Sequence, residues 1–281
     1  MRRELLLLAA ALFLTLAAGA QSVETLSVSE EPDGFYSKTL GSYLIQGNVK
    51  DGLKEGAWYE FYLDKTLIHR VIQYQKGKKD GLYMEIDETG NLTKKSEYSD
   101  DKLNGTTFSW YRGGRLASKN TYRDDVLEGE QIKCYEQGGN QEVSEYKDGL
   151  RDGLTIWFDM DGNKVMTIEY NQGQFYGKQE TFYKDGTLKT SKEFKDNVQD
   201  GPAYEYYESG ALKSEATYKN GKLSGKVKTY ADKPTNSVKP LKETDKEAKT
   251  MTLSKDTKAM DLQRVAKPNV TSDKKVVVKN P

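Results

Sequence analysis

The chain has 281 residues, of which 36% are hydrophobic and 31% are charged, and its mean hydropathy is −0.82. Basic and acidic residues number 43 each, so the formal net charge is zero. This composition argues against a thick central hydrophobic core, and the neutral charge argues against a nucleic-acid-binding protein.

Residues 1–20 have the pattern of a secretory signal peptide. Arg2 and Arg3 form its positive start, residues 5–18 form an apolar run, and a small-residue cleavage site precedes Gln21. The apolar run is shorter than the roughly twenty residues that a membrane-spanning helix needs. We therefore expect an exported protein, in the periplasm, on the cell surface or secreted, with no integral membrane span after cleavage.

Residues 21–43 show only faint periodicity and are expected to form a loose lead-in segment. Residues 44–52 resemble the second half of the unit that recurs after them, and we expect a capping strand there. Terminal units of a repeat array usually differ from the rest because one side faces solvent.

Residues 44–230 are dominated by a repeat whose period is 24 residues. An anchor glycine opens each unit, a second glycine follows nine residues later, and an aromatic residue follows after seventeen. Recurrence at this period marks a repeat array, and glycine recurs where a tight turn needs a positive φ. The turn-defining anchor glycines are Gly56, Gly81, Gly105, Gly129, Gly153, Gly177, Gly201 and Gly225.

Each unit reads as a β-hairpin, with strands over about anchor +1 to +6 and +11 to +17. The fold class is therefore all-β, an elongated, twisted antiparallel meander of about seven hairpin repeats. Alternation predicts a packed face formed by positions +3, +5, +11 and +17. Position +6 should lie on the other face, where a column of tyrosines is the candidate partner-binding or ligand-binding surface: Tyr62, Tyr111, Tyr135, Tyr183 and Tyr207.

Residues 231–281 abandon this pattern. They contain no aromatic residue, and 12 lysines and arginines outnumber 7 acids. A polar segment of this kind cannot bury enough apolar surface to offset its ordering entropy, so we expect a disordered basic tail.

The repeat resembles the bacterial variant of the MORN repeat (membrane occupation and recognition nexus). The resemblance lies in the pattern G-x-x-x-x-[YF]-[YF]-x-x-G-x-L-K-x-x-x-x-Y-x-x-G-x-x-x-G, which is clearest over residues 177–225. It implies a hairpin meander that serves as an interaction scaffold. Some members of the family bind lipid or partner proteins, and some bacterial variant-repeat proteins carry an antitoxin-like label.

The residues that could carry chemistry are few. His69 is the one histidine and has no nucleophile beside it in sequence, while Cys134 occupies a strand position typical of a small buried residue. Residues 159–163, DMDGN, resemble the start of a calcium loop but lack its later spacing. We therefore expect no enzyme activity, no cofactor and no metal.

These observations favour an exported, non-catalytic scaffold that binds a partner protein or a cell-envelope component, with surface lipid or glycan as further contacts. A carbohydrate-binding or cell-wall-binding module that uses the tyrosine column is the first alternative. An antitoxin-like inhibitor is the second, and it follows from the family resemblance alone.

Overall fold

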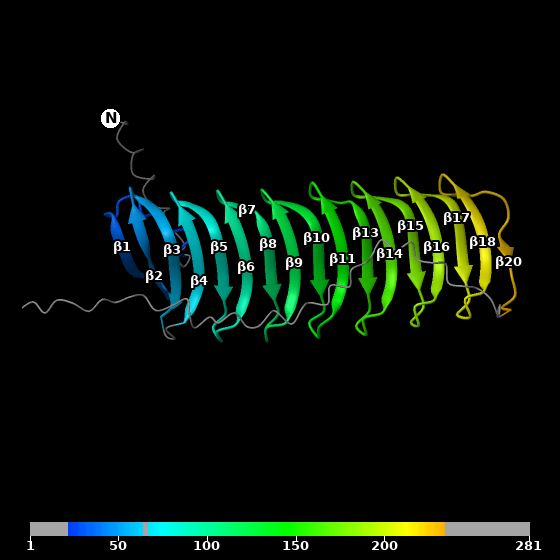
Figure 1. The fold of residues 1–281 in the computed structure, drawn as a ribbon, viewed down its shortest axis with the longest axis horizontal. Helices are drawn as coiled ribbons and strands as arrows, with labels where there is room; N and C mark the ends of the chain where they lie inside the picture. Colours follow the sequence, from blue (N-terminus) through cyan, green and yellow to red (C-terminus); the bar gives the residue numbers. More distant parts are fainter. Residues whose placement is uncertain (1–21, 64–66, 234–281) are drawn as a thin grey trace, which may run out of the picture. The chain divides into compact units, whose positions relative to one another are not determined.

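The computed structural model describes residues 22–63 and 67–233. The expected signal peptide and nearly all of the expected disordered tail lie outside the described residues. Within them the chain is all-β, and its twenty strands form one sheet whose members lie side by side in chain order (Figure 1). Every pairing is antiparallel, so the predicted meander of hairpin repeats is confirmed.

The strands are β1 (Gly34–Leu40), β2 (Tyr43–Lys50), β3 (Leu53–Tyr62), β4 (Ile68–Gln75), β5 (Lys78–Ile86), β6 (Leu92–Ser99), β7 (Lys102–Leu103), β8 (Gly105–Trp110), β9 (Leu116–Arg123), β10 (Val126–Cys134), β11 (Asn140–Lys147), β12 (Leu150–Arg151), β13 (Gly153–Phe158), β14 (Lys164–Asn171), β15 (Gln174–Phe182), β16 (Leu188–Lys195), β17 (Val198–Tyr206), β18 (Leu212–Lys219), β19 (Lys222–Leu223) and β20 (Lys228–Thr229). The two-residue strands β7, β12 and β19 pair with β6, β11 and β18. The strand that follows each of them, β8, β13 or β20, pairs with that same neighbour.

Two kinds of turn alternate along the sheet, and each explains part of the sequence pattern. The turn between repeats has two central residues with positive φ, as at Asp148 (50°) and Gly149 (80°), which is the conformation that a tight hairpin requires. The turn inside each repeat closes with the second glycine, for example Gly162 with φ of 86°, whose N–H donates to the carbonyl of Asp159.

The anchor glycines also have positive φ, from 70° at Gly56 to 134° at Gly201. A side chain would be strained there, and at Gly201 a Cβ would lie 2.8 Å from the Cβ of Glu193. The glycine column predicted from the sequence is thus a backbone requirement of every repeat.

Acidic side chains immediately before several anchor glycines fasten neighbouring turns to one another. The carboxylate of Glu55 accepts the N–H of Lys76 (2.8 Å), and that of Glu128 accepts the N–H of Asp148 (3.0 Å). Because the same contact occurs at Asp80 and Asp200, part of the high acid content belongs to the fold itself.

The predicted packed face was right to group position +11 with +3 and +5 but wrong to include +17, and the buried side chains of the first strands lie instead at +2 and +4, as at Trp58 and Glu60. In repeat three, Thr107 pairs with Asn120 and Ser109 with Ser118, but the register shifts so that Trp110 pairs with Leu116. This bulge contains one extra residue and so changes the parity of the strand. Positions +13, +15 and +17 therefore share a face with +2 and +4, and positions +3, +5 and +11 lie on the other.

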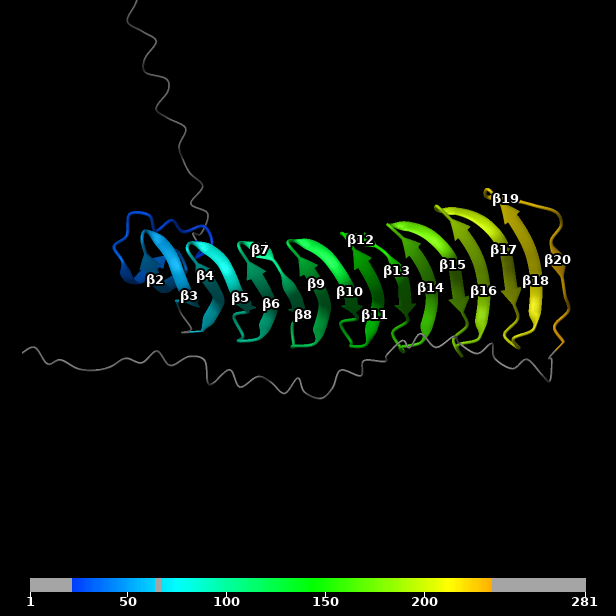
Figure 2. The same cartoon turned by 45° about the horizontal axis from the view of Figure 1, so that its top comes forward.

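We call the face with positions +2, +4, +13, +15 and +17 the capped face, because the lead-in segment covers one end of it. The expected loose lead-in is in fact ordered from residue 22, and β1 pairs with β2 through Leu40↔Tyr43 and six further antiparallel pairs up to Gly34↔Val49. Figure 2 shows the lead-in at the end of the sheet formed by β1 to β4. The strand expected over residues 44–52 forms as β2, but it does not end the sheet, because β1 pairs with its other side.

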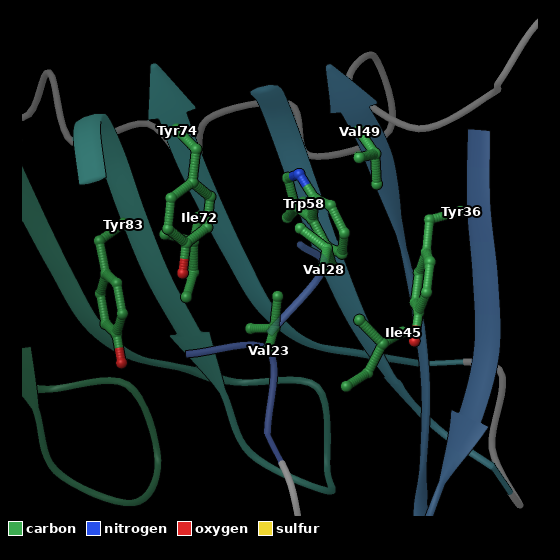
Figure 3. Close-up of a cluster of buried hydrophobic side chains, with 9 residues drawn as sticks. All are labelled: Val23, Val28, Tyr36, Ile45, Val49, Trp58, Ile72, Tyr74 and Tyr83. Atoms are coloured by element: carbon green, nitrogen blue, oxygen red, sulfur yellow. The ribbon is translucent and has the colours of Figure 1, made fainter. Parts of the chain in front are cut away.

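The hydrophobic core lies beneath this lead-in segment. Val23 and Val28 are 0% and 4% exposed, and Figure 3 shows them in front of the strands that carry Trp58, Ile72 and Tyr74. Gly47 leaves the space for the indole of Trp58, since a Cβ there would lie only 2.1 Å from the ring. A compact core therefore exists at one end of the sheet, although composition argues against one through its whole length.

Deleting residues 129–152 should leave a folded protein that is one repeat shorter. Gly153 would then follow Glu128 in phase, and each repeat packs mainly on its neighbours. Circular dichroism and thermal melting would check this. The matched control deletes residues 129–151, which exchanges the two faces of every later strand and should abolish cooperative melting; equal behaviour of both deletions would contradict the phase requirement.

Candidate functional site

The tyrosine column predicted as a binding surface connects successive repeats. The hydroxyl of Tyr111 donates to the carbonyl of Cys134 (2.9 Å), one repeat further along, and the hydroxyl of Tyr135 donates to that of Phe158 (2.8 Å). The same bond joins Tyr62 to Ile86 (3.1 Å), Tyr183 to Tyr206 (2.8 Å) and Tyr207 to Tyr230 (2.9 Å).

These rings are half-buried, and the accepting carbonyl always belongs to position +5 of the next repeat. Each of these hydrogen bonds gives a partner to both the tyrosine hydroxyl and the backbone carbonyl. The column therefore has a structural role that accounts for its recurrence, and its role as a contact surface for a partner stays a hypothesis.

Aspartate replaces tyrosine at position +6 in two repeats and satisfies a different set of groups. The carboxylate of Asp87 accepts the hydroxyl of Thr89 and the N–H groups of Thr89 and Asn91, which lowers the pKa of Asp87 to about 2. Asp159 accepts the side-chain amide of Asn163 and the N–H groups of Asp161 and Asn163 in the same way, and its pKa is likewise lowered. The calcium-like sequence at residues 159–163 is thus a turn that its own aspartate caps.

The lead-in segment is held on the capped face by a buried carboxylate and a buried ammonium group. Glu60 is 0% exposed, and its Oε2 accepts the N–H of Val23 (2.8 Å). The Nζ of Lys54 donates to the carbonyl of the same residue, Val23. Both backbone polar groups of Val23 are therefore hydrogen-bonded to buried side chains of the sheet.

His69 and Arg70 complete the surroundings of Glu60. The Nδ1 of His69 lies 2.6 Å from Glu60 Oε1, and the Nη1 of Arg70 lies 3.4 Å from it. Burial raises the pKa of Glu60, but the hydrogen bonds from His69 and Val23 and the charge of Arg70 outweigh it, so the pKa lies below its ordinary value. Burial lowers the pKa of Lys54 to about 8.

His69 and Cys134, the two residues considered for catalysis, are engaged in packing and hydrogen bonding. The ring of His69 stacks on that of Tyr43 at 5.0 Å between centroids and bonds to Glu60. Cys134 is 6% exposed, and burial raises the pKa of its thiol, which disfavours the reactive thiolate. Neither arrangement resembles a nucleophile beside a base.

A second buried carboxylate, which the sequence analysis did not single out, lies on the capped face three repeats further along. Glu142 is 8% exposed and accepts hydrogen bonds from Ser144 (2.6 Å) and Arg151 (2.5 Å). Burial raises the pKa of Glu142, but these bonds and the positive charges of Arg151 and Lys133 outweigh the effect of burial, so the pKa lies below its ordinary value. The pair does not recur in the other repeats, so no signal in the sequence marks it.

The sequence of repeats six and seven decides the family comparison. A family model described as the MORN repeat variant matches residues 175–196 and 199–220. Each matched segment starts two residues before an anchor glycine and ends one residue after the second strand of its hairpin. No curated protein matches the chain.

The strand register extends the MORN-like geometry beyond the matched segments. Gly177 pairs with Phe194 and Gly201 with Tyr218 in the matched repeats, and Gly105 pairs with Tyr122 at the same offset in repeat three. The earlier hairpins therefore share the backbone plan of the two that match.

Replacing Tyr183 or Tyr207 by phenylalanine should lower the free energy of unfolding by about 1 kcal/mol each, because one hydrogen bond between repeats is lost. Denaturant unfolding measures this. Tyr204→Phe is the control, since no hydrogen bond joins that hydroxyl to the described residues. Unchanged stability in Tyr183→Phe and Tyr207→Phe would show that the bonds contribute nothing to folding.

Glu60→Ala should destabilise the protein by about 3 kcal/mol at neutral pH, because it leaves buried partners unpaired. Glu205→Ala, at the same repeat position but with a 39% exposed side chain, should cost less than about 1 kcal/mol.

The pH dependence gives this prediction a second readout. The pKa of Glu60 is lower in the folded protein than its ordinary 4.5, so its contribution is present above pH 4.5 and is lost as the pH falls through the folded value. The difference between wild type and Glu60→Ala should therefore shrink in acid. A difference that is constant from neutral to strongly acidic pH would contradict the assignment.

Proposed function

We propose that this protein is an exported, non-catalytic repeat scaffold that binds a partner protein or a cell-envelope component through its sheet. The observation that carries the proposal is the aromatic surface beyond the second repeat, where rings on both faces are half-exposed. Half-exposed aromatic rings supply large contact areas in protein interfaces. On the capped face they are Tyr122, Tyr146, Trp157, Tyr170, Phe194 and Tyr218, and on the other face Phe108, Trp110, Phe158, Tyr204 and Tyr206.

The non-catalytic part of the proposal is supported by the described side chains that could react. His69 and Cys134 serve packing and hydrogen bonding, as their contacts indicate. No group of three histidine, cysteine, aspartate or glutamate residues in the described ranges could hold a metal ion.

Export is supported by the sequence of residues 1–20, which lies outside the described residues. Among residues 22–63 and 67–233, no helix long and apolar enough to cross a membrane is found. The binding role is proposed for the mature chain that starts at Gln21.

Binding of a protein is favoured over binding of a carbohydrate. Stacking of a sugar on the tyrosine column needs free ring faces, but the ammonium groups of Lys189 and Lys213 lie 5.4 and 5.8 Å from the ring centroids of Tyr183 and Tyr207. Cations placed over these rings already satisfy their electron-rich faces. The antitoxin-like alternative rests on the family resemblance alone.

The mature protein, immobilised and exposed to the envelope fraction of its own cells, should retain a specific protein or envelope component. Mass spectrometry and glycan analysis of the retained material would identify it, and N-terminal sequencing of the exported protein should give Gln21 as the first residue. Retention only of glycans would favour the carbohydrate alternative. An intact Met1 on a protein found only in the cytoplasm would contradict export.

A further inference from the structure

The last strand of the sheet, β20, stands in the place of the first strand of an eighth repeat. Thr229 pairs with Ser214 and Lys228 with Glu215. The first strand of repeat three pairs with the strand before it at the same offsets, through Ser109↔Lys94 and its neighbour. The strand β20 therefore has the same register as the first strand of an earlier repeat.

Side chains and backbone groups hold this strand in position. Glu215 accepts bonds from the Nζ of Lys228 (2.7 Å) and the hydroxyl of Tyr230 (2.9 Å), while the carbonyl of Tyr230 accepts the hydroxyl of Tyr207 (2.9 Å). The N–H of Tyr230 donates to the carbonyl of Lys213 (2.9 Å). Four hydrogen bonds thus fix an edge strand of only two paired residues.

The outer side of this strand has no partner strand among the described residues. In repeats one to seven the first strand pairs on that side with the second strand of its own hairpin. The effect on burial is large at position +2, where Val227 is 48% exposed but Thr107 and Thr155 are 7% and 0% exposed. The inward N–H of Tyr230 and the alternation along a strand place the polar backbone groups of Val227 and Thr229 on the free edge.

The sequence after Tyr230 does not repeat the pattern of a second strand. The positions that would pair with this edge, residues 236–242, read NSVKPLK and lack the aromatic residue that other repeats have at +17. Pro240 would fall at position +15, where a backbone N–H is needed for the ladder. Residues 236–242 therefore lack the sequence features of a second strand, and the edge suits a strand from another polypeptide.

We infer that the free edge of β20 is a binding site for one extended strand of a partner protein, which completes the eighth hairpin by antiparallel strand addition. The inference rests on the proposed scaffold function and specifies how the partner is bound. Strand addition to an open sheet edge is an established mode of peptide recognition, in which backbone bonds supply affinity and alternate side chains supply specificity.

Repeat six shows which side chains such a strand should carry, because its first strand resembles this edge. Lys178, Thr181 and Phe182 stand where Lys226, Thr229 and Tyr230 stand at the edge. In repeat six, these residues pair with Glu193, Thr190 and Leu188, and the two threonine hydroxyls lie 2.6 Å apart. The incoming strand should therefore read Leu-x-Thr-x-x-Glu followed by an aromatic residue.

Charge and space at the edge suit this pattern. The aromatic residue would fall opposite Gly225, as Phe194 falls opposite Gly177 in repeat six. The glutamate would fall opposite Lys226, which lines a cavity of about 330 Å³ beside β18. Lysines on an edge strand discourage indiscriminate pairing, and Lys226 favours a strand with a glutamate opposite it over one with an apolar residue there.

The test uses the full chain and a labelled synthetic peptide with the sequence of residues 187–195, TLKTSKEFK. Fluorescence anisotropy should show saturable binding. Val227→Pro removes an outward N–H and should weaken binding about tenfold or more, whereas Val227→Ala keeps that N–H and should stay within about threefold. Thermal melting checks that both variants remain folded.

A charge exchange tests the register. Glu193→Lys in the peptide should weaken binding to the wild-type chain, and Lys226→Glu in the protein should restore it. Absence of saturable binding up to about 1 mM, or equal binding by Val227→Pro and wild type, would overturn the inference. Either result would leave the scaffold function standing if the envelope partner is still retained, and loss of that retention would remove the scaffold function separately.

Discussion

Every hairpin in this protein depends on its neighbours for the partners of its backbone groups. An isolated two-stranded hairpin is marginally stable in water, and here each strand from β2 to β18, apart from the two-residue strands β7 and β12, shares its ladder with a strand on either side. The period of 24 residues is the condition for that sharing, since a slip of one residue would exchange the faces. Anchor glycines with positive φ and the bulge in each hairpin keep the period constant.

Contacts between equivalent positions reinforce the ladder. The tyrosine hydroxyls reach the next repeat, and the acids before the anchor glycines hold the adjacent turns. A one-layer sheet has little buried apolar area beyond its capped end, so these polar contacts provide cohesion where a core is absent. Because no second layer covers the sheet beyond its capped end, the aromatic rings are half-exposed on both faces and available to partners.

The repeat, the hairpins and the turn positions could be predicted because period and glycine conformation are local properties. The faces could not be predicted fully, because alternation counted through a turn does not reveal an extra residue such as Ala117, which lies between the partners of Ser109 and Trp110. The order of the lead-in also escaped prediction. Val23 is buried by contacts with Glu60 and Lys54, more than thirty residues away in sequence, and faint periodicity gave no sign of them.

The tyrosines were correctly recognised as a regular column, but their hydrogen bonds to carbonyls one repeat away could not be read from spacing. Glu142 and Arg151 were missed for a related reason, since a single ion pair leaves no periodic trace. Both cases show that repetition in sequence identifies equivalent positions without revealing what those positions contact.

The two aspartates at position +6 interrupt the series of tyrosine hydroxyl bonds. Asp87 and Asp159 bond within their own turns, so the tyrosine hydroxyl bond is replaced at the junctions between repeats two and three and between repeats five and six. The bonds from Tyr111 and Tyr135 join repeats three to five, and those from Tyr183 and Tyr207 join repeats six and seven to β20. These hydroxyl bonds thus link the described repeats into three groups, and at the two junctions that carry aspartate the repeats are joined by the backbone ladder without this side-chain bond.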